Sequence, residues 1–296
     1  MSIALVFLPD FLLIVVGAVL ARLRAFDPIF WTGTERLVYF VLFPALLFRS
    51  LAAGAPAIGN SLPLLATGLT FTLAGIALSY LGRFLFRLPE GDFAACFQCG
   101  FRFNTYLALA VAERLQGADG LAAITLLVGV LVPVVNVAAV SMLARDGRSR
   151  VLPALIRNPL VLACAAGLAW SALRLPLPDV ADRVVGSLGG ASLALGLLTV
   201  GAALRLEGGL PAAPLAYWTA LKLVALPACA LLGGRAFGLQ APVLQLAIVM
   251  AAVPTAPSAY VLAMQMSGRG RPVAFLVTTG TLAAAVTLPL WLAATS

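Results

Sequence analysis

The sequence contains no histidine, a single lysine and few charged residues of any kind. Charged residues make up 10% of the 296 residues, with 19 basic and 11 acidic side chains, whereas soluble domains carry about 25%. The lack of histidine excludes a histidine-based proton relay or metal site. The lack of polar side chains excludes a water-soluble globule of this size, because too little polar surface is available to cover it.

Two further absences reduce the number of possible functional classes. The pattern G-x-x-x-x-G-K-[ST], which holds nucleotide phosphates, does not occur. No two carboxylates lie together in an apolar segment, so we expect neither an enzyme nor a cofactor.

The four cysteines all lie in apolar runs, which argues against an extracellular disulfide framework. The stretch "CFQC" at 96–99 has metal-site spacing but no second pair, so packing is the better interpretation.

Apolar residues make up 62% of the chain, and the mean hydropathy is +1.06. The apolar runs have the length of a helix that spans a bilayer, about 17–25 residues, and show no alternation typical of a membrane barrel. The sequence therefore predicts an all-α polytopic membrane protein. We expect ten transmembrane helices, at 3–21, 36–53, 62–81, 93–115, 120–144, 157–174, 184–204, 213–233, 241–266 and 272–294.

The arginines indicate how these helices are oriented. An even number of spans puts both termini on one side, and most arginines lie in the loops of the other side, at 22–36, 82–92, 145–157, 205–212 and 267–271. Because basic loops stay in the cytoplasm, we predict a multi-pass membrane protein with both termini outside. The first segment lacks a basic n-region and a cleavage site, so we predict a span rather than a signal peptide.

The most basic stretch, "RDGRSRVLPALIRNP" at 145–159, divides the ten helices into two sets of five. Because five is odd, the second set enters the membrane from the opposite side. This predicts two inverted five-helix repeats, 1–150 and 151–296, which is the plan of many secondary transporters. The stretch "FNTYLALA" at 103–110 resembles "PSAYVLAM" at 257–264, each in the fourth helix of its half.

The ninth predicted helix contains "VPTAPSAY". Pro254 and Pro257 lack N–H donors and each clashes with a carbonyl four residues back, so we expect this helix to be broken. Carbonyls freed at membrane depth must be buried in protein or face water. With Thr255, Ser258 and Tyr260 beside them, the prolines predict a segment that lines a cavity, while a simple kink in a packing helix remains the alternative.

The fourth predicted helix carries Arg102 about 14 Å from its cytoplasmic end, at about 1.5 Å per residue. An arginine near the midplane costs at least about 2.5–3.5 kcal/mol, which indicates a function, although snorkelling to the interface is the alternative. Gln98, Asn104, Thr105 and Tyr106 lie beside it and complete the candidate substrate-binding set on this helix. No proline breaks it, so we expect an interruption here mainly by symmetry with the ninth helix.

Lys222 falls in the middle of the eighth predicted helix, in "YWTALKLVALPAC". The other basic residues are all arginine, so the position of this one lysine is notable. A buried lysine can lose its proton at an accessible pH, which arginine cannot. Lys222 is therefore a candidate for coupling transport to protons, and a static counter-charge or a snorkelling side chain is the alternative.

Several stretches together resemble the auxin efflux carrier family of membrane transporters along the whole chain. These are "LVYFVLFPALLFRSL" at 37–51, "FRFNTYLALA" at 101–110, "LKLVALP" at 221–227, and "VPTAPSAYVLAMQMSG" followed by "VTTGTLAAAVTLPLWL". The last pair is the most specific. The family lies within the bile acid/auxin carrier-like superfamily and includes many bacterial permeases.

The resemblance implies helices 4 and 9 that are broken and cross at mid-membrane beside the substrate. Helices 1, 2, 6 and 7 would form a scaffold, often in a homodimer, and helices 3–5 and 8–10 a transport unit. Known substrates of the family are organic anions such as auxin, malate and malonate. A planar arginine fork suits a carboxylate, so the residues agree with the family on the sign of the substrate.

We therefore expect a secondary active transporter, or a uniporter, that moves an organic carboxylate across the membrane by alternating access. A coupling ion, H+ or Na+, is possible, and a sodium-coupled symporter of the bile-acid-carrier type is the nearest alternative. A membrane sensor of organic anions is more remote. The expected partners are the anion, the lipid bilayer and a second copy of the chain, with no nucleic acid and no metal.

Overall fold

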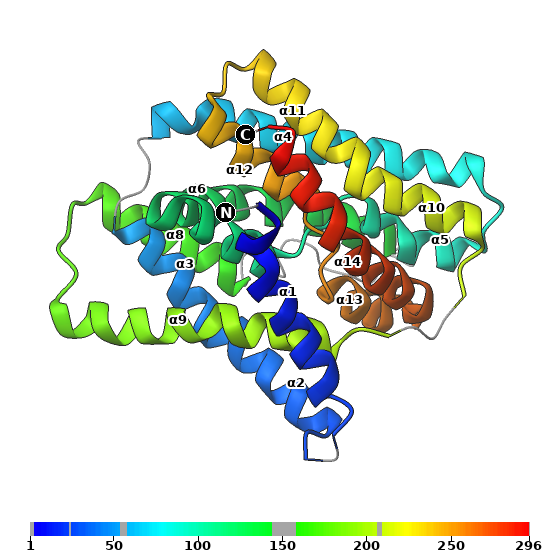
Figure 1. The fold of residues 1–296 in the computed structure, drawn as a ribbon, viewed down its shortest axis with the longest axis horizontal. Coiled ribbons are helices and arrows are strands. Elements are labelled where there is room, and N and C mark those ends of the chain that lie inside the picture. Colours follow the sequence, from blue (N-terminus) through cyan, green and yellow to red (C-terminus); the bar gives the residue numbers. More distant parts are fainter. Residues whose placement is uncertain (1–2, 24, 54–57, 144–157, 206–208, 296) are drawn as a thin grey trace. The chain divides into compact units, whose positions relative to one another are not determined.

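The computed structural model describes residues 3–23, 25–53, 58–143, 158–205 and 209–295, and all regular structure within these ranges is helical (Figure 1). Arg24 and the whole of the basic loop at 145–157, both used above to predict the topology, lie outside the described residues. The prediction of an all-α protein is confirmed for the described part of the chain.

All ten predicted segments contain helix. The first five correspond to α1 (Ile3–Leu20), α2 (Pro28–Leu37) with the π-helical η1 (Val38–Leu42) and α3 (Phe43–Ala52), α4 (Ile58–Leu85), α5 (Glu90–Phe97) with the 3-10 helix η2 (Gln98–Gly100), and α6 (Thr105–Leu143). Helix α6 holds the end of the fourth predicted helix and the described part of the fifth. It bends at Gln116 and Gly117, where Gly117 has a φ of 59° that a side chain rarely tolerates.

The remaining five segments correspond to α8 (Pro159–Ala172), α9 (Asp179–Ala202), α10 (Ala212–Ala220) with the π-helical η3 (Leu221–Ala225) and α11 (Leu226–Ala236), α12 (Ala241–Ala252) with α13 (Ser258–Ser267), and α14 (Gly270–Ala293). Five helical stretches in the described part are long and apolar enough to cross a bilayer, namely Ser61–Leu85, Glu90–Leu143, Asp179–Ala202, Ala212–Ala236 and Gly270–Ala293. The chain is thus a multi-pass membrane protein, while the total of ten spans and their inverted repetition remain predictions.

Each π-helical turn in the described part of the chain ends one residue short of a proline. Pro44 and Pro227 are the second residues of α3 and α11. A proline has no N–H and its ring clashes with the carbonyl one turn back, so the wider π turn accommodates it without ending the helix. Lys222 lies in the second of these turns. Such turns frequently mark functional positions.

The chain packs as two compact units, each described here by itself. The first comprises Met1–Leu62, Tyr106–Val132 and Leu152–Ala203. Within it, α1 packs along α9, and α3 packs against α8 and α9. Helices α1 and α9 approach so closely that a Cβ atom on Gly201 would lie 1.9 Å from the carbonyl oxygen of Ile14. Small residues allow such backbone contact between membrane helices.

The second unit comprises Pro63–Thr105, Pro133–Val151 and Leu204–Ser296. Within it, α14 contacts α5, α12 and α13, and α11 packs against α12. Trp218 of α10 is 1% exposed, and its indole N–H donates to the hydroxyl of Ser79 on α4. Each unit combines segments from both halves of the sequence. The repeats 1–150 and 151–296 and the scaffold and transport helices stay predictions.

Candidate functional site at two interrupted helices

The fourth predicted helix is interrupted immediately after its 3-10 turn. Helix η2 ends at Gly100, residues 101–104 are not helical, and α6 begins at Thr105. A Cβ atom on Gly100 would lie 2.6 Å from the Oγ atom of Ser79, so only glycine lets α4 pass this closely. The Ser79 hydroxyl donates to the carbonyl of Phe97, which satisfies one of the acceptors that a helix end leaves open.

The ninth predicted helix is interrupted at its two prolines. Helix α12 ends at Ala252, residues 253–257 are not helical, and α13 begins at Ser258. Since Pro254 and Pro257 provide no N–H, the carbonyls near the end of α12 lack helical donors. The interruption predicted from the prolines is therefore present. The interruption of the fourth helix, which the sequence indicated only by symmetry, is present as well.

The two interruptions are hydrogen-bonded to each other. The backbone N–H of Asn104 donates to the carbonyl of Pro254 over 2.7 Å. In the other direction, the Thr255 hydroxyl donates to the carbonyl of Cys99 over 2.7 Å. Asn104 and Thr255 are 0% and 4% exposed. Backbone groups that lost their helical partners thus find new ones across the gap, which is the condition for non-helical backbone at membrane depth.

Gln98 supplies a third link between the two segments. Its Nε2 atom donates to the carbonyls of Ala259, at 3.1 Å, and Ala95, at 3.3 Å. Two acceptors around Nε2 fix the orientation of the amide, because a flipped amide would set its oxygen against two carbonyls. The side chain is fully buried, and within the described residues no donor reaches its Oε1 atom.

Arg102 lies inside the first interruption and is 8% exposed. Its backbone N–H donates to the carbonyl of Gln98 over 3.0 Å. Its Nη2 atom donates to the Oδ1 atom of Asn136 on α6, within the same unit. This contact with a neutral amide helps to orient the guanidinium. A buried arginine of this kind indicates a function.

Lys222 is 3% exposed, and its Nζ atom donates to the carbonyl of Ala251 in the last turn of α12. A cation is favoured at the C-terminal end of a helix, where carbonyls carry partial negative charge. Among the described residues, no carboxylate lies within 4 Å of this ammonium group. The second interruption therefore has a buried cation at its edge, as the first has one inside it.

The other predicted substrate-binding residues lie less deep. Thr105 and Pro257 are half-buried, and Ser258 and Tyr260 are exposed. Tyr106 belongs to the other compact unit, where its ring lies 4.7 Å from that of Phe43. The structure thus brings together one buried set in the second unit, made up of Gln98, Arg102, Asn104, Lys222, Pro254 and Thr255.

Two residues that contribute to the site, Asn136 and Ser79, were not predicted from the sequence. Asn136 is a lone amide in the apolar stretch "LVPVVNVAAV", and this polarity is a signal that points to it. Ser79 carries no such signal, because isolated serines are common in membrane helices. Within the described part of the chain, no group of three histidine, cysteine, aspartate or glutamate side chains gathers as metal ligands do. The site consists of two buried cations and the ends of interrupted helices, which suits an anion.

Comparison with known sequences identifies the family. The profile of the family described as "Membrane transport protein" matches residues 148–292, which contain η3, α12 and α13 with Lys222 and both prolines. Residues 148–292 thus match a family of membrane transport proteins, and this match supports an auxin efflux carrier permease. Members of this auxin efflux carrier family are transporters and not enzymes. No curated protein matches the chain. The resemblance drawn from "VPTAPSAY" and "LKLVALP" is thereby confirmed for the second half.

Proposed function

We propose that this auxin efflux carrier family member moves an organic carboxylate anion across the membrane by alternating access, as a secondary transporter or a uniporter. One observation carries the proposal, namely that Arg102 is buried inside an interrupted helix that is hydrogen-bonded to a second interrupted helix. A guanidinium binds carboxylate through two parallel N–H donors. The N-terminal ends of α6 and α13 add partial positive charge that favours an anion, worth about 0.3–2 kcal/mol each.

The architecture that we propose is the one predicted from the sequence. Ten spans form two inverted repeats, helices 4 and 9 cross at mid-membrane, and helices 1, 2, 6 and 7 serve as a scaffold for a transport unit made of helices 3–5 and 8–10. Both termini face the periplasm of a bacterial inner membrane, and the chain forms a homodimer. The interruptions described above support the crossing, because half-helices that end near each other at membrane depth form the ion and substrate sites of many transporters.

The proposed roles follow from burial and chemistry. Arg102 holds the carboxylate, and the hydroxyl groups of Thr105, Ser258 and Tyr260 line its path. Pro254 and Pro257 keep the second helix open. The remaining predicted contributors to binding are Gln98, Asn104, Tyr106 and Thr255.

The test is uptake of labelled mono- and dicarboxylates into proteoliposomes, with Arg102→Ala compared with Arg235→Ala. Arg235 is an exposed arginine in the last turn of α11, within the same unit, and serves as the matched control. We expect Arg102→Ala to lower uptake at least tenfold, Arg102→Lys to restore part of it, and Arg235→Ala to change little. Equal uptake by the wild-type protein and Arg102→Ala would refute the proposal.

Lys222 is proposed as the group that couples transport to protons. The Lys222→Arg variant keeps the charge at the end of α12 but prevents loss of the proton, so the pH dependence of uptake should flatten. An unchanged pH profile would exclude this role. Replacing sodium by choline in the same assay separates proton-coupled or uncoupled transport from the sodium-symport alternative. Ligand binding without flux in sealed liposomes would instead indicate a sensor.

A further inference from the structure

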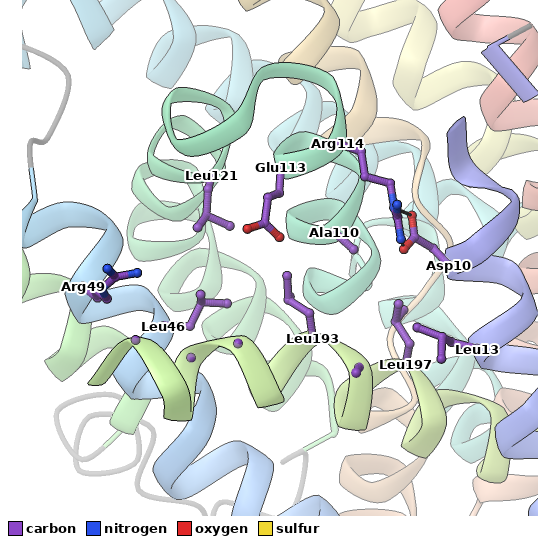
Figure 2. A pocket seen from close by; sticks show the side chains of 14 residues that line it. Asp10, Leu13, Leu46, Arg49, Ala110, Glu113, Arg114, Leu121, Leu193 and Leu197 are labelled. Atoms are coloured by element: carbon purple, nitrogen blue, oxygen red, sulfur yellow. Dashed lines mark hydrogen bonds and ion pairs between the residues drawn. The ribbon is translucent and has the colours of Figure 1, made fainter. Parts of the chain in front are cut away.

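A second feature of the chain lies in the first compact unit, in residues that the proposed transport site does not use. It is a cavity of about 450 Å³, within the range of small-molecule sites. Figure 2 shows it between α1, α3, α6 and α9. Its charged lining residues are Asp10, Arg49, Glu113 and Arg114, and its large apolar ones are Leu13, Leu46, Leu121, Leu193 and Leu197.

The floor of the cavity is a stretch of α9 rich in small residues. Lining positions run from Gly186 to Leu197, which at 1.5 Å per residue is about 16 Å. A Cβ atom on Gly189 would lie 3.2 Å from the backbone of Leu46, but one on Gly190 would meet no atom within 4 Å. Gly190 therefore borders open space, and a larger side chain there would enter the cavity without a clash.

Two arginines at the sides of the cavity keep donors for a ligand. Arg49 uses Nε and Nη2 to hold Asp182, at 2.7 and 2.9 Å. Arg114 uses Nε to hold both carboxylate oxygens of Asp10, at 2.9 and 2.8 Å. Within the described residues, no hydrogen bond engages Nη1 of Arg49 or the two terminal nitrogens of Arg114. Each guanidinium is thus held in place by a carboxylate, while some of its N–H groups remain available to donate to a ligand.

Glu113 provides the opposite charge. Its carboxylate forms no ion pair or hydrogen bond within the described part of the chain. Figure 2 shows it pointing from α6 into the space above α9, between Leu121 and Leu193. Glu113 is exposed at the cavity lining, so its carboxylate is accessible to a ligand that supplies a positive charge.

We propose that this cavity binds a small zwitterion with an aliphatic body, of the class of the aliphatic α-amino acids. The ammonium group would pair with Glu113, the carboxylate would take the open N–H groups of Arg49 or Arg114, and the side chain would lie among the leucines. The lining carries two positive and two negative side chains, so it matches a ligand with both charges. A simple anion would pair only with the arginine donors and a simple amine only with Glu113, whereas a zwitterion would form both charge-assisted interactions.

Binding to the purified full-length protein tests the proposal, with leucine, 4-methylpentanoate and 3-methylbutylamine as probes. These share the aliphatic body and differ in charge. Isothermal titration should show leucine binding at least tenfold more tightly than either of the others. The Glu113→Gln variant should lose at least tenfold in leucine affinity while its affinity for 4-methylpentanoate holds or rises. Failure of leucine to bind, or equal binding of all three probes, would overturn the proposal.

Two glycine variants locate the binding. Gly190→Leu should abolish leucine binding by filling the cavity. Gly33→Leu is the matched control, because Gly33 is also a helical glycine whose Cβ would meet nothing within 4 Å, but it lies on α2 and not in the cavity lining. Leucine affinity unchanged by Gly190→Leu would place the ligand elsewhere and refute the site. Arg102→Ala should leave leucine binding intact, which separates this site from the proposed transport site.

Discussion

The hydrogen bond between Thr255 and Cys99 offers a precise perturbation of the paired interruptions. The Thr255→Val substitution conserves shape and removes only the hydroxyl that donates to the Cys99 carbonyl over 2.7 Å. That carbonyl lies at the end of η2, and the loss leaves a buried acceptor unsatisfied, which costs about 1–3 kcal/mol. Interhelical hydrogen bonds in membranes average about 0.6 kcal/mol and reach about 1.7. We therefore expect Thr255→Val to lower the free energy of unfolding by about 1–2 kcal/mol.

Thr281→Val is the matched control. Thr281 is 2% exposed, and its hydroxyl also bonds over 2.7 Å, but to the carbonyl of Val277 one turn back in α14. The carbonyl of Val277 retains its helical N–H donor, so this substitution should cost little. Thermal unfolding of the detergent-solubilised protein should show a lower Tm for Thr255→Val than for Thr281→Val. Equal shifts in Tm would refute the view that the Thr255 hydroxyl replaces a missing helical donor.

Two further predictions concern the first unit. Arg114→Ala leaves Asp10, whose side chain is 2% exposed, as a buried carboxylate without its cation, and should cost about 3 kcal/mol of stability. Arg49→Ala, which breaks an exposed pair, should lower Tm far less; the reverse order would contradict this reasoning. Gly201→Ala should prevent normal folding, because its Cβ would lie 1.9 Å from a carbonyl oxygen of α1. Gly190→Ala should fold normally by size-exclusion chromatography, and a well-folded Gly201→Ala would show that α1 and α9 can separate.

The helical segments were predictable because apolar runs and proline chemistry are local properties. Pro254 and Pro257 remove N–H donors whatever surrounds them, so the interruption of the ninth helix could be predicted from two residues. The break at Arg102 has a different origin. It depends on Gly100 meeting Ser79 of α4 and on Asn104 bonding across to Pro254, and sequence spacing does not show which segments will meet.

The partners of the two buried cations show the same limit. Arg102 and Lys222 were identifiable as charges in apolar runs, but the contact with Asn136 and the position at the Ala251 carbonyl depend on tertiary packing. The cavity of the first unit was also unpredictable. Its lining joins four elements that are distant in sequence.

The central claim is that Arg102 binds a carboxylate substrate where the two interrupted helices meet. The most direct measurement is a thermal-shift screen of the purified protein against mono- and dicarboxylates, repeated with Arg102→Ala. At least one carboxylate should raise the Tm of the wild-type protein, and this stabilisation should disappear in the variant. Stabilisation of equal size in Arg102→Ala would contradict the claim.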